Sequence, residues 1–188
     1  MAEQLNSEEM DLLDLVRAEL GRASADRKHP FRYFVVANSD YGAPELRTVV
    51  LRKTVGDLRL RFYTDARSPK IEQFRDDTLV SALFYHPKKK LQARVRTHAE
   101  ILPDSDPVYR ELRQQIAHSA SLADYTTQSP PGTVLQNPAQ AQAGEEIHFA
   151  VIELVPFEFD ILQLRRAGHR RALYRRDEGY WEGKALVP

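Results

Sequence analysis

With 188 residues and 27 acidic residues against 27 basic ones, the chain has the length of one folded domain and no net charge that would favour nucleic acid as a partner. Cysteine is absent, which excludes disulfides, thiolate metal sites and thiol nucleophiles. No apolar run approaches the roughly 18 residues that cross a bilayer, and the acidic N-terminus does not resemble a signal peptide, so we expect a cytoplasmic protein with no membrane partner.

Residues 1–30 predict an N-terminal helix and a joint before the rest of the single domain, 1–188. Asn6 can cap this helix, and Leu5 can pack against its first turn. Gly21 is where we expect the helix to end. The apolar positions at helical spacing are Met10, Leu13, Val16 and Leu20.

Alternating and β-branched runs then predict strands, here 31–37, 46–53, 58–63, 78–85, 91–102, 147–155, 157–164 and 170–176. We expect a turn at 38–40 between the first two strands. The pattern predicts a mainly β fold, a barrel of six to eight mostly antiparallel strands with a few peripheral helices.

Two short helices interrupt the strands. Ser68 is expected to cap the first helix, with Pro69 in its first turn and Ile71 and Phe74 on its buried side. Asp106 opens the second helix, whose expected inward residues are Val108, Leu112 and Ile116. After it, residues 118–145 form a long Ala-, Gln- and Pro-rich segment, which we interpret as a short helix and then a mobile lid or excursion.

Cationic and hydroxyl side chains occur at two strand ends and at the start of the first short helix. They are Arg47, Arg52, Tyr63, Thr64, Ser68 and Lys70. A fold that brings them together would form a phosphate site, because guanidinium, ammonium, hydroxyl and helix-start N–H groups all favour a dianion. The alternative is that Arg47 and Arg52 only occupy a solvated strand face.

Other enzyme signatures are absent from the sequence. There is no dinucleotide-binding glycine motif, P-loop, serine-hydrolase elbow or zinc-hydrolase motif, and the six histidines are scattered, so no metal site is predicted. Isolated His98 and His148 are interpreted as structural or exposed. Trp181 is expected to plug the barrel end.

Four motifs in register give a resemblance to a known family. In order, RTVVLR, FYT, SPK and LQARVRTHAEIL resemble the pattern R-x-V-L-L-K, F-Y-T, S-x-K and R-Q-V-x-V-x-G-x-A-E of the pyridoxamine 5′-phosphate oxidase-like FMN-binding split-barrel family. The resemblance covers residues 31–102 closely and 147–188 loosely. It implies a split β-barrel, FMN as cofactor, and a homodimer with FMN at the subunit interface.

The same resemblance implies which residues bind FMN. Ser68 and Lys70 would meet the phosphate, Gln92 would reach the flavin from the partner subunit, and Arg171 would lie close to the ring. The full implied set is Arg47, Thr48, Val49, Val50, Leu51, Arg52, Tyr63, Thr64, Ser68, Lys70, Gln92, Gln128, Ser129 and Arg171. No catalytic side chain is assigned, because the flavin itself would carry the redox chemistry.

Departures from the family pattern bear on the substrate. The family's Arg-x-His substrate clamp reads Ala167, Gly168, His169 here, so a vitamin B6 phosphate would lack an anchor. The resemblance therefore implies an oxidoreductase of the Alr4036-type branch with a different small-molecule redox substrate, rather than a working pyridoxamine phosphate oxidase. Two alternatives stay open: a non-catalytic flavin-binding or storage protein, and a cofactor-free interaction module.

Overall fold

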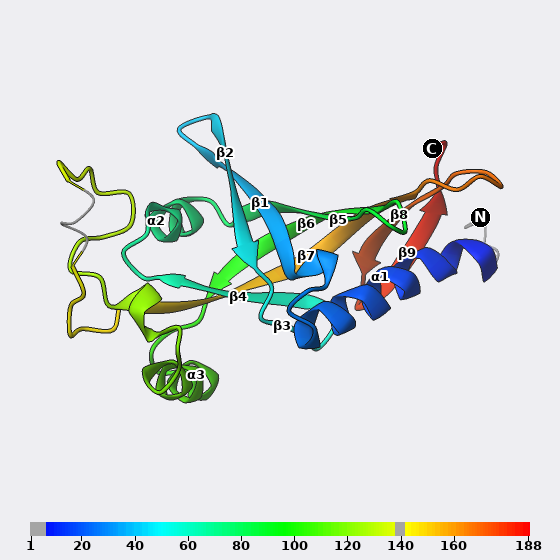
Figure 1. Ribbon diagram of the computed structural model, residues 1–188. Coiled ribbons are helices and arrows are strands. Elements are labelled where there is room, and N and C mark those ends of the chain that lie inside the picture. The colour runs from blue at the N-terminus through cyan, green and yellow to red at the C-terminus, as the bar shows by residue number, and fades with distance from the viewer. Residues whose placement is uncertain (1–6, 138–141) are drawn as a thin grey trace.

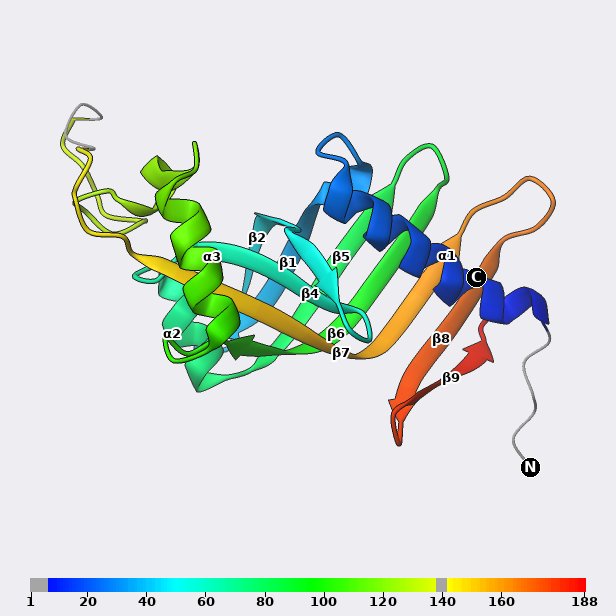
Figure 2. The same ribbon diagram turned by 90° about the horizontal axis from the view of Figure 1, so that it is seen from below.

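A computed structural model describes residues 7–137 and 142–188, without the side chains of 7–11; Asn6, Leu5 and the Met10 side chain lie outside the described residues. The elements are α1 (Ser7–Ala25), η1 (Pro30–Arg32), β1 (Tyr33–Asp40), β2 (Ala43–Val50), β3 (Lys53–Val55), β4 (Arg59–Asp65), α2 (Pro69–Asp76), β5 (Leu79–His86), β6 (Leu91–Ile101), α3 (Pro107–Ala117), η2 (Leu122–Tyr125), β7 (Phe149–Gln163), β8 (Arg170–Asp177) and β9 (Tyr180–Ala185). Figures 1 and 2 show α1 at one end of the molecule and α2 and α3 at the other.

All strands belong to one antiparallel sheet in the order β2-β1-β5-β6-β7-β4-β3, with β8 paired to β7 and β9 to β8. Residues 7–137 and 142–188 thus form nine strands instead of the expected six to eight, since β3 and β9 were not predicted. No backbone pairing joins β2 to β4 or β3 among the described strands, so the sheet curls without closing. This architecture confirms the predicted split barrel.

The barrel interior is filled by the alternate residues that each strand turns inward. The rings of Phe34 and Phe84 stack with centroids 4.6 Å apart, and Phe62 meets Phe34 edge-on. On the outside, α1 covers the barrel end near β3, β8 and β9 with buried Val16 and Leu20. Among the described residues, no helix is both long and apolar enough to span a membrane.

Two predicted boundaries of the N-terminal region are wrong. The helix α1 continues past Gly21 to Ala25, because its last turn also packs against the barrel and Ala23 is fully buried. The first hairpin turns at Tyr41 and Gly42, not at 38–40. Both turn residues have positive φ, as a two-residue hairpin of this hand requires, and glycine supplies one of them.

The predicted break at Pro156 is also wrong. β7 is one strand of 15 residues. Pro156 lies between the stretch of β7 that pairs with β4 and the stretch that pairs with β8, so no ladder bond on that side is lost. On the other side the register against β6 shifts between Arg96 and Thr97, a bulge that accommodates the proline.

The two short helices form near their predicted positions with altered details. Ser68 is the N-cap of α2 but makes no side-chain cap bond, whereas Asp106 caps α3 by accepting from the Val108 N–H. On α3 the expected inward residue Ile116 is buried, and Leu112 packs against the same cluster. Val108 is only half-buried, and the buried residue of that turn is Tyr109 instead, which corrects this part of the prediction. The Tyr109 hydroxyl explains the shift, because it donates to the Phe149 carbonyl at 3.0 Å.

Candidate functional site

A cavity of about 460 Å³ lies between the two unpaired ends of the sheet, where β2 faces β4 and the start of α2. Eight of the predicted FMN residues line it, together with five residues that were not predicted. Its lining is Glu45, Arg47, Thr48, Val49, Val50, Tyr63, Thr64, Ser68, Pro69, Lys70, Gln73, Pro131 and Gly132. The sheet topology therefore brings residues 47–50 of β2, residues 63 and 64 of β4 and the start of α2 together around this cavity.

Lys70 is the half-buried cation of this cavity. Its ammonium group donates to the Thr64 hydroxyl at 2.9 Å and to the Ser68 hydroxyl. Burial lowers the pKa of Lys70, and the nearby Arg47 charge lowers it further. Asp65 opposes this effect, but its carboxylate is held by Arg67 at 2.8 Å. Within the described ranges no carboxylate lies within ion-pair distance of Lys70, so the ammonium is solvated only by neutral oxygens.

Arg47 is the second cation of the cavity, and it comes from the inward face of β2. Its guanidinium donates to the Asn38 side-chain carbonyl at 2.5 Å and to the Gln73 side-chain carbonyl at 3.1 Å. Among the described residues, Glu45 is the one acid within ion-pair distance of it, at 3.6 Å, and that side chain is about half exposed. Arg47 and Lys70 thus both line the cavity, and Glu45 is the one acid among its described lining residues.

This donor set fits a phosphate group. A phosphate dianion would remove the repulsion between Arg47 and Lys70 and would accept from the Ser68 and Thr64 hydroxyls. The helix α2 begins at the cavity with its positive dipole end, since Ser68, Pro69 and Lys70 all line it. Every one of these groups favours negative charge at the same point.

Two further predicted residues of the RTVVLR segment lie beside the cavity rather than in its lining. The side chain of Leu51 is fully buried in the core, and its N–H donates to the Arg32 carbonyl at 2.8 Å. The Arg52 guanidinium lies 5.4 Å from the centre of the Tyr63 ring. Its Nε atom is buried and has no hydrogen-bond partner among the described residues, a donor that remains to be satisfied.

Gln92 and Arg171 lie elsewhere, on the outward face of the sheet. Each is the register partner of Leu162, Gln92 on β6 and Arg171 on β8, so the three form one row across neighbouring strands. Arg171 makes two bonds to Asp160, at 2.9 and 2.8 Å, and these bonds raise its pKa. Within one chain, neither residue belongs to the cavity.

Gln128 and Ser129 occupy the base of the long segment after η2. The segment is closed there by the bond from the Gln128 N–H to the Gln142 carbonyl, at 2.9 Å. Arg67 connects it to the barrel by donating to the Gln128 carbonyl at 3.1 Å. Neither residue lines the cavity, but Pro131 and Gly132 of the same segment do. The segment therefore covers one side of the cavity.

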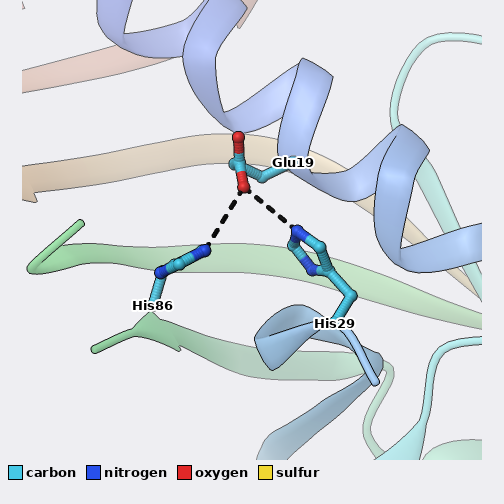
Figure 3. A group of neighbouring side chains, drawn as sticks. All are labelled: Glu19, His29 and His86. Atoms are coloured by element: carbon cyan, nitrogen blue, oxygen red, sulfur yellow. Dashed lines mark hydrogen bonds and ion pairs between the residues drawn. The ribbon is translucent and has the colours of Figure 1, made fainter. Parts of the chain in front are cut away.

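A second polar cluster lies under α1, where Glu19, His29 and His86 are all buried (Figure 3). The Glu19 carboxylate faces Nε2 of His29 at 3.0 Å and Nε2 of His86 at 3.6 Å. Arg22 and Lys89 also pair with this carboxylate. The fold thus brings together two histidines that the sequence analysis described as scattered.

The hydrogen bonds of this cluster decide its role. Nδ1 of His29 accepts from the Phe31 N–H at 3.1 Å, and Nδ1 of His86 accepts from the Lys89 N–H at 3.2 Å. Each ring therefore carries its proton on Nε2, directed at Glu19, whereas a metal ion would require the Nε2 lone pair. We describe these residues as the Glu19 anchor, which ties α1 to η1 and to the β5–β6 turn.

Several cavity residues were missed by the sequence analysis. Gln73 stands three residues after Lys70, and helical spacing alone places the two on one face of α2. Asn38 does not line the cavity but bonds to Arg47 beside it; it was predicted in a turn, and only the register of β1 against β2 turns it inward. Pro131 and Gly132 have no local signal that relates them to the cavity.

Comparison with known proteins agrees with this geometry. The family described as pyridoxamine 5′-phosphate oxidase, FMN-binding domain, matches residues 15–103. The fold of the whole chain matches a pyridoxamine 5′-phosphate oxidase-related, FMN-binding protein from Nostoc punctiforme with a TM-score of 0.75 at 22% identity, covering 99% of this chain and 100% of that one. This chain has the fold of a pyridoxamine 5′-phosphate oxidase-like split barrel, and residues 15–103 match the FMN-binding domain of that family.

Other split barrels support the assignment at the level of the fold. PhzG from Burkholderia lata, solved with tetrahydrophenazine-1-carboxylic acid, matches with a TM-score of 0.74 at 19% identity over 99% of this chain and 98% of that one. General Stress Protein 26 from Bacillus anthracis matches with a TM-score of 0.51 at 16% identity, over 79% of this chain and 93% of that one. No curated protein is significantly similar to the sequence.

Proposed function

We propose that this split barrel binds FMN with its phosphate in the cavity and acts as an FMN-dependent oxidoreductase on a small molecule. The observation that carries the proposal is the pairing of Arg47 and Lys70 around one cavity, where Lys70 has only neutral partners among the described side chains. The match of residues 15–103 to an FMN-binding domain supports the same cofactor.

Each cavity group has a distinct part in holding the cofactor. Lys70, Ser68 and Thr64 would hold the phosphate from the α2 side, and Arg47 would hold it from β2. When bound, FMN would supply a ring that accepts and returns a hydride. Arg52 is our candidate for the positive charge beside that ring, because Arg171 is already paired with Asp160, whereas the Nε–H of Arg52 has no partner in the described chain.

We also propose that the site is completed by a second copy of the chain. Gln92 and Arg171 lie on the outward sheet face, in the same row as Tyr85, which pairs with Gln92 on β5. Tyr85 is 51% exposed and Tyr33, on the adjacent β1, is 61% exposed. Exposed aromatic side chains on a sheet face are typical of an interface. Docking of this face on the cavity of a partner would bring Gln92 to the cofactor.

The dimer has a direct test in Tyr85→Asp. A charge in an apolar contact disfavours association, so we expect the variant to run as a monomer in size-exclusion chromatography with light scattering. The matched control is Tyr180→Asp on β9, where the ring is also exposed but the residue pairs with Asp177, six residues along β8 from Arg171 and so away from this row. If both variants keep the mass of the parent protein, the proposed interface is wrong.

The cofactor is tested by the visible spectrum of the purified protein and by titration of the stripped protein with FMN and riboflavin. We expect a yellow protein that prefers FMN, because riboflavin lacks the phosphate that the cavity holds. Equal affinity for both would contradict the proposed phosphate site.

Reduction experiments then separate the enzyme from the alternatives. An oxidoreductase would be bleached rapidly by a suitable nicotinamide or amine donor and would recover in air, whereas a storage protein would hold FMN with negligible turnover. A cofactor-free interaction module would be colourless and would bind polyanions in a salt-sensitive way.

A further inference from the structure

We infer that Asn38 and Gln73 are positioning residues that hold the Arg47 guanidinium toward the cavity with its charge intact, an inference that rests on the proposed phosphate site. The three side chains form a closed triangle of hydrogen bonds. Arg47 donates to Asn38 at 2.5 Å and to Gln73 at 3.1 Å, and the Asn38 amide donates to the same Gln73 oxygen at 3.2 Å. The triangle ties β1, β2 and α2 together at the edge of the cavity.

The positions of the two amides are set by different elements. Asn38 is buried on the inward face of β1, where it is the register partner of Glu45 and lies diagonal to Arg47. Gln73 lies on α2 one turn after Lys70, and both side chains line the cavity. The same helix therefore presents one cation to the cavity directly and orients the other through Gln73.

Both amides are neutral, so they orient the Arg47 guanidinium without reducing its charge. Most other arginines with a close partner in the described chain pair with carboxylates, as Arg61 does with Glu153 at 2.6 Å. Beside Arg47 the one carboxylate of the described chain is that of Glu45, which is about half exposed and 3.6 Å away. An amide oxygen orients a guanidinium and satisfies one of its five N–H groups, but it does not cancel the charge. A carboxylate at the same place would cancel the charge and compete with the phosphate.

The isosteric variant Gln73→Glu tests this inference, because it keeps the shape of the side chain and adds one negative charge. We expect its affinity for FMN to fall about tenfold to a hundredfold, while its affinity for riboflavin changes little, since only FMN carries the phosphate. We expect the melting temperature of the cofactor-free variant to stay equal or rise, because the new carboxylate pairs with Arg47. Asn38→Asp should act in the same direction.

The matched control is Gln114→Glu, which adds the same charge at an exposed position of α3 that does not line the cavity. Fluorescence titration with FMN and with riboflavin measures both affinities, and thermal unfolding measures stability. Unchanged FMN affinity in Gln73→Glu, or an equal loss of FMN and riboflavin together with a lower melting temperature, would overturn the positioning role. A parent protein that does not prefer FMN would instead overturn the proposed phosphate site and this inference with it.

Discussion

The cavity and the Glu19 anchor are both clusters of cations and hydrogen-bond donors, but they balance charge in opposite ways. In the anchor, Lys89, Arg22 and the His29 imidazole bond to one buried carboxylate, and His86 lies 3.6 Å from it. In the cavity, Arg47 and Lys70 are held mainly by amides and hydroxyls. A cation matched by an acid of the same chain contributes to the fold, whereas a cation left unmatched at a cavity is available to an anion from outside.

The two regions therefore affect different properties: the anchor affects the stability of the fold, and the cavity affects ligand affinity. Removing the acid of the anchor leaves buried donors unsatisfied, so its effect falls on folding. Removing a cation of the cavity relieves repulsion in the empty protein, so its effect falls on the ligand. We expect a substitution in the anchor to lower the free energy of unfolding with little change in FMN affinity. We expect a substitution in the cavity to lower FMN affinity with little loss of stability.

The largest effect is expected for Glu19→Ala. The change leaves the Nε2–H group of His29 buried without its acceptor and removes the carboxylate that pairs with Arg22 and Lys89. We expect the free energy of unfolding to fall by about 3 kcal/mol. Chemical denaturation measures the loss, and the exposed Glu145→Ala is the control. The FMN affinity of the folded variant should stay within about twofold of the parent. A large loss of FMN affinity would mean that the two regions are coupled.

Arg47→Ala should have the next largest effect, on binding. Because a charge-assisted contact with phosphate is lost, we expect the affinity for FMN to fall about thirtyfold, with little change in the affinity for riboflavin. Titration with both flavins measures this difference. The melting temperature should change only slightly, because the partners Asn38 and Gln73 still bond to each other. Parent-like FMN binding would count against the cavity as the phosphate site.

Lys70→Met should lower the affinity for FMN on the order of tenfold and leave the cofactor-free protein equally or more stable. The reason is that burial lowers the pKa of Lys70, so the folded protein holds this charge at a cost that methionine removes. Paired measurements of FMN affinity and thermal unfolding check both parts. A less stable variant would show that Lys70 supports the fold, which would contradict the expectation that the cavity cations serve ligand binding alone.

The smallest expected effect is a pH dependence of protein stability that comes from His86 of the Glu19 anchor. Burial lowers the pKa of His86 below its ordinary value of 6.5, and the Lys89 charge lowers it further against the opposing effect of Glu19. Below pH 6.5 the unfolded chain therefore binds a proton that the folded chain does not, so stability falls as the pH falls from 6.5 through the folded pKa.

Thermal unfolding between pH 7 and pH 5 should show this decline, and His86→Gln should flatten it, because glutamine keeps an N–H donor but does not titrate. Burial also raises the pKa of Glu19, but the hydrogen bonds from Lys89 and His29 outweigh it and leave the pKa lowered. Its contribution is therefore lost only at more acid pH, below the ordinary value of 4.5. An unchanged slope in His86→Gln would assign the decline to other groups.

Much of the fold and of the candidate site was accessible from local sequence. Alternating apolar residues predicted the central strands, and Ser68-Pro69 marked the start of α2, because these signals act between residues that are close in the chain. The same locality explains why Thr64, Ser68 and Lys70 were found, since each stands at or beside the end of a recognisable element. Arg47 was found within the RTVVLR strand motif, although it lies in the middle of β2. The sequence determined which segments form the barrel and which side chains stand at their ends.

Only the tertiary structure decided which distant side chains meet. His29 and His86 share one carboxylate, Pro156 lies inside a continuous strand, and Asn38 turns inward beside Gln73, 35 residues away. The physical reason is register: a shift of one residue between two strands moves every side chain to the other face, and no local pattern specifies that pairing. Partners such as Asn38 and Gln73 are therefore fixed by the assembled sheet and helix, and not by either segment alone.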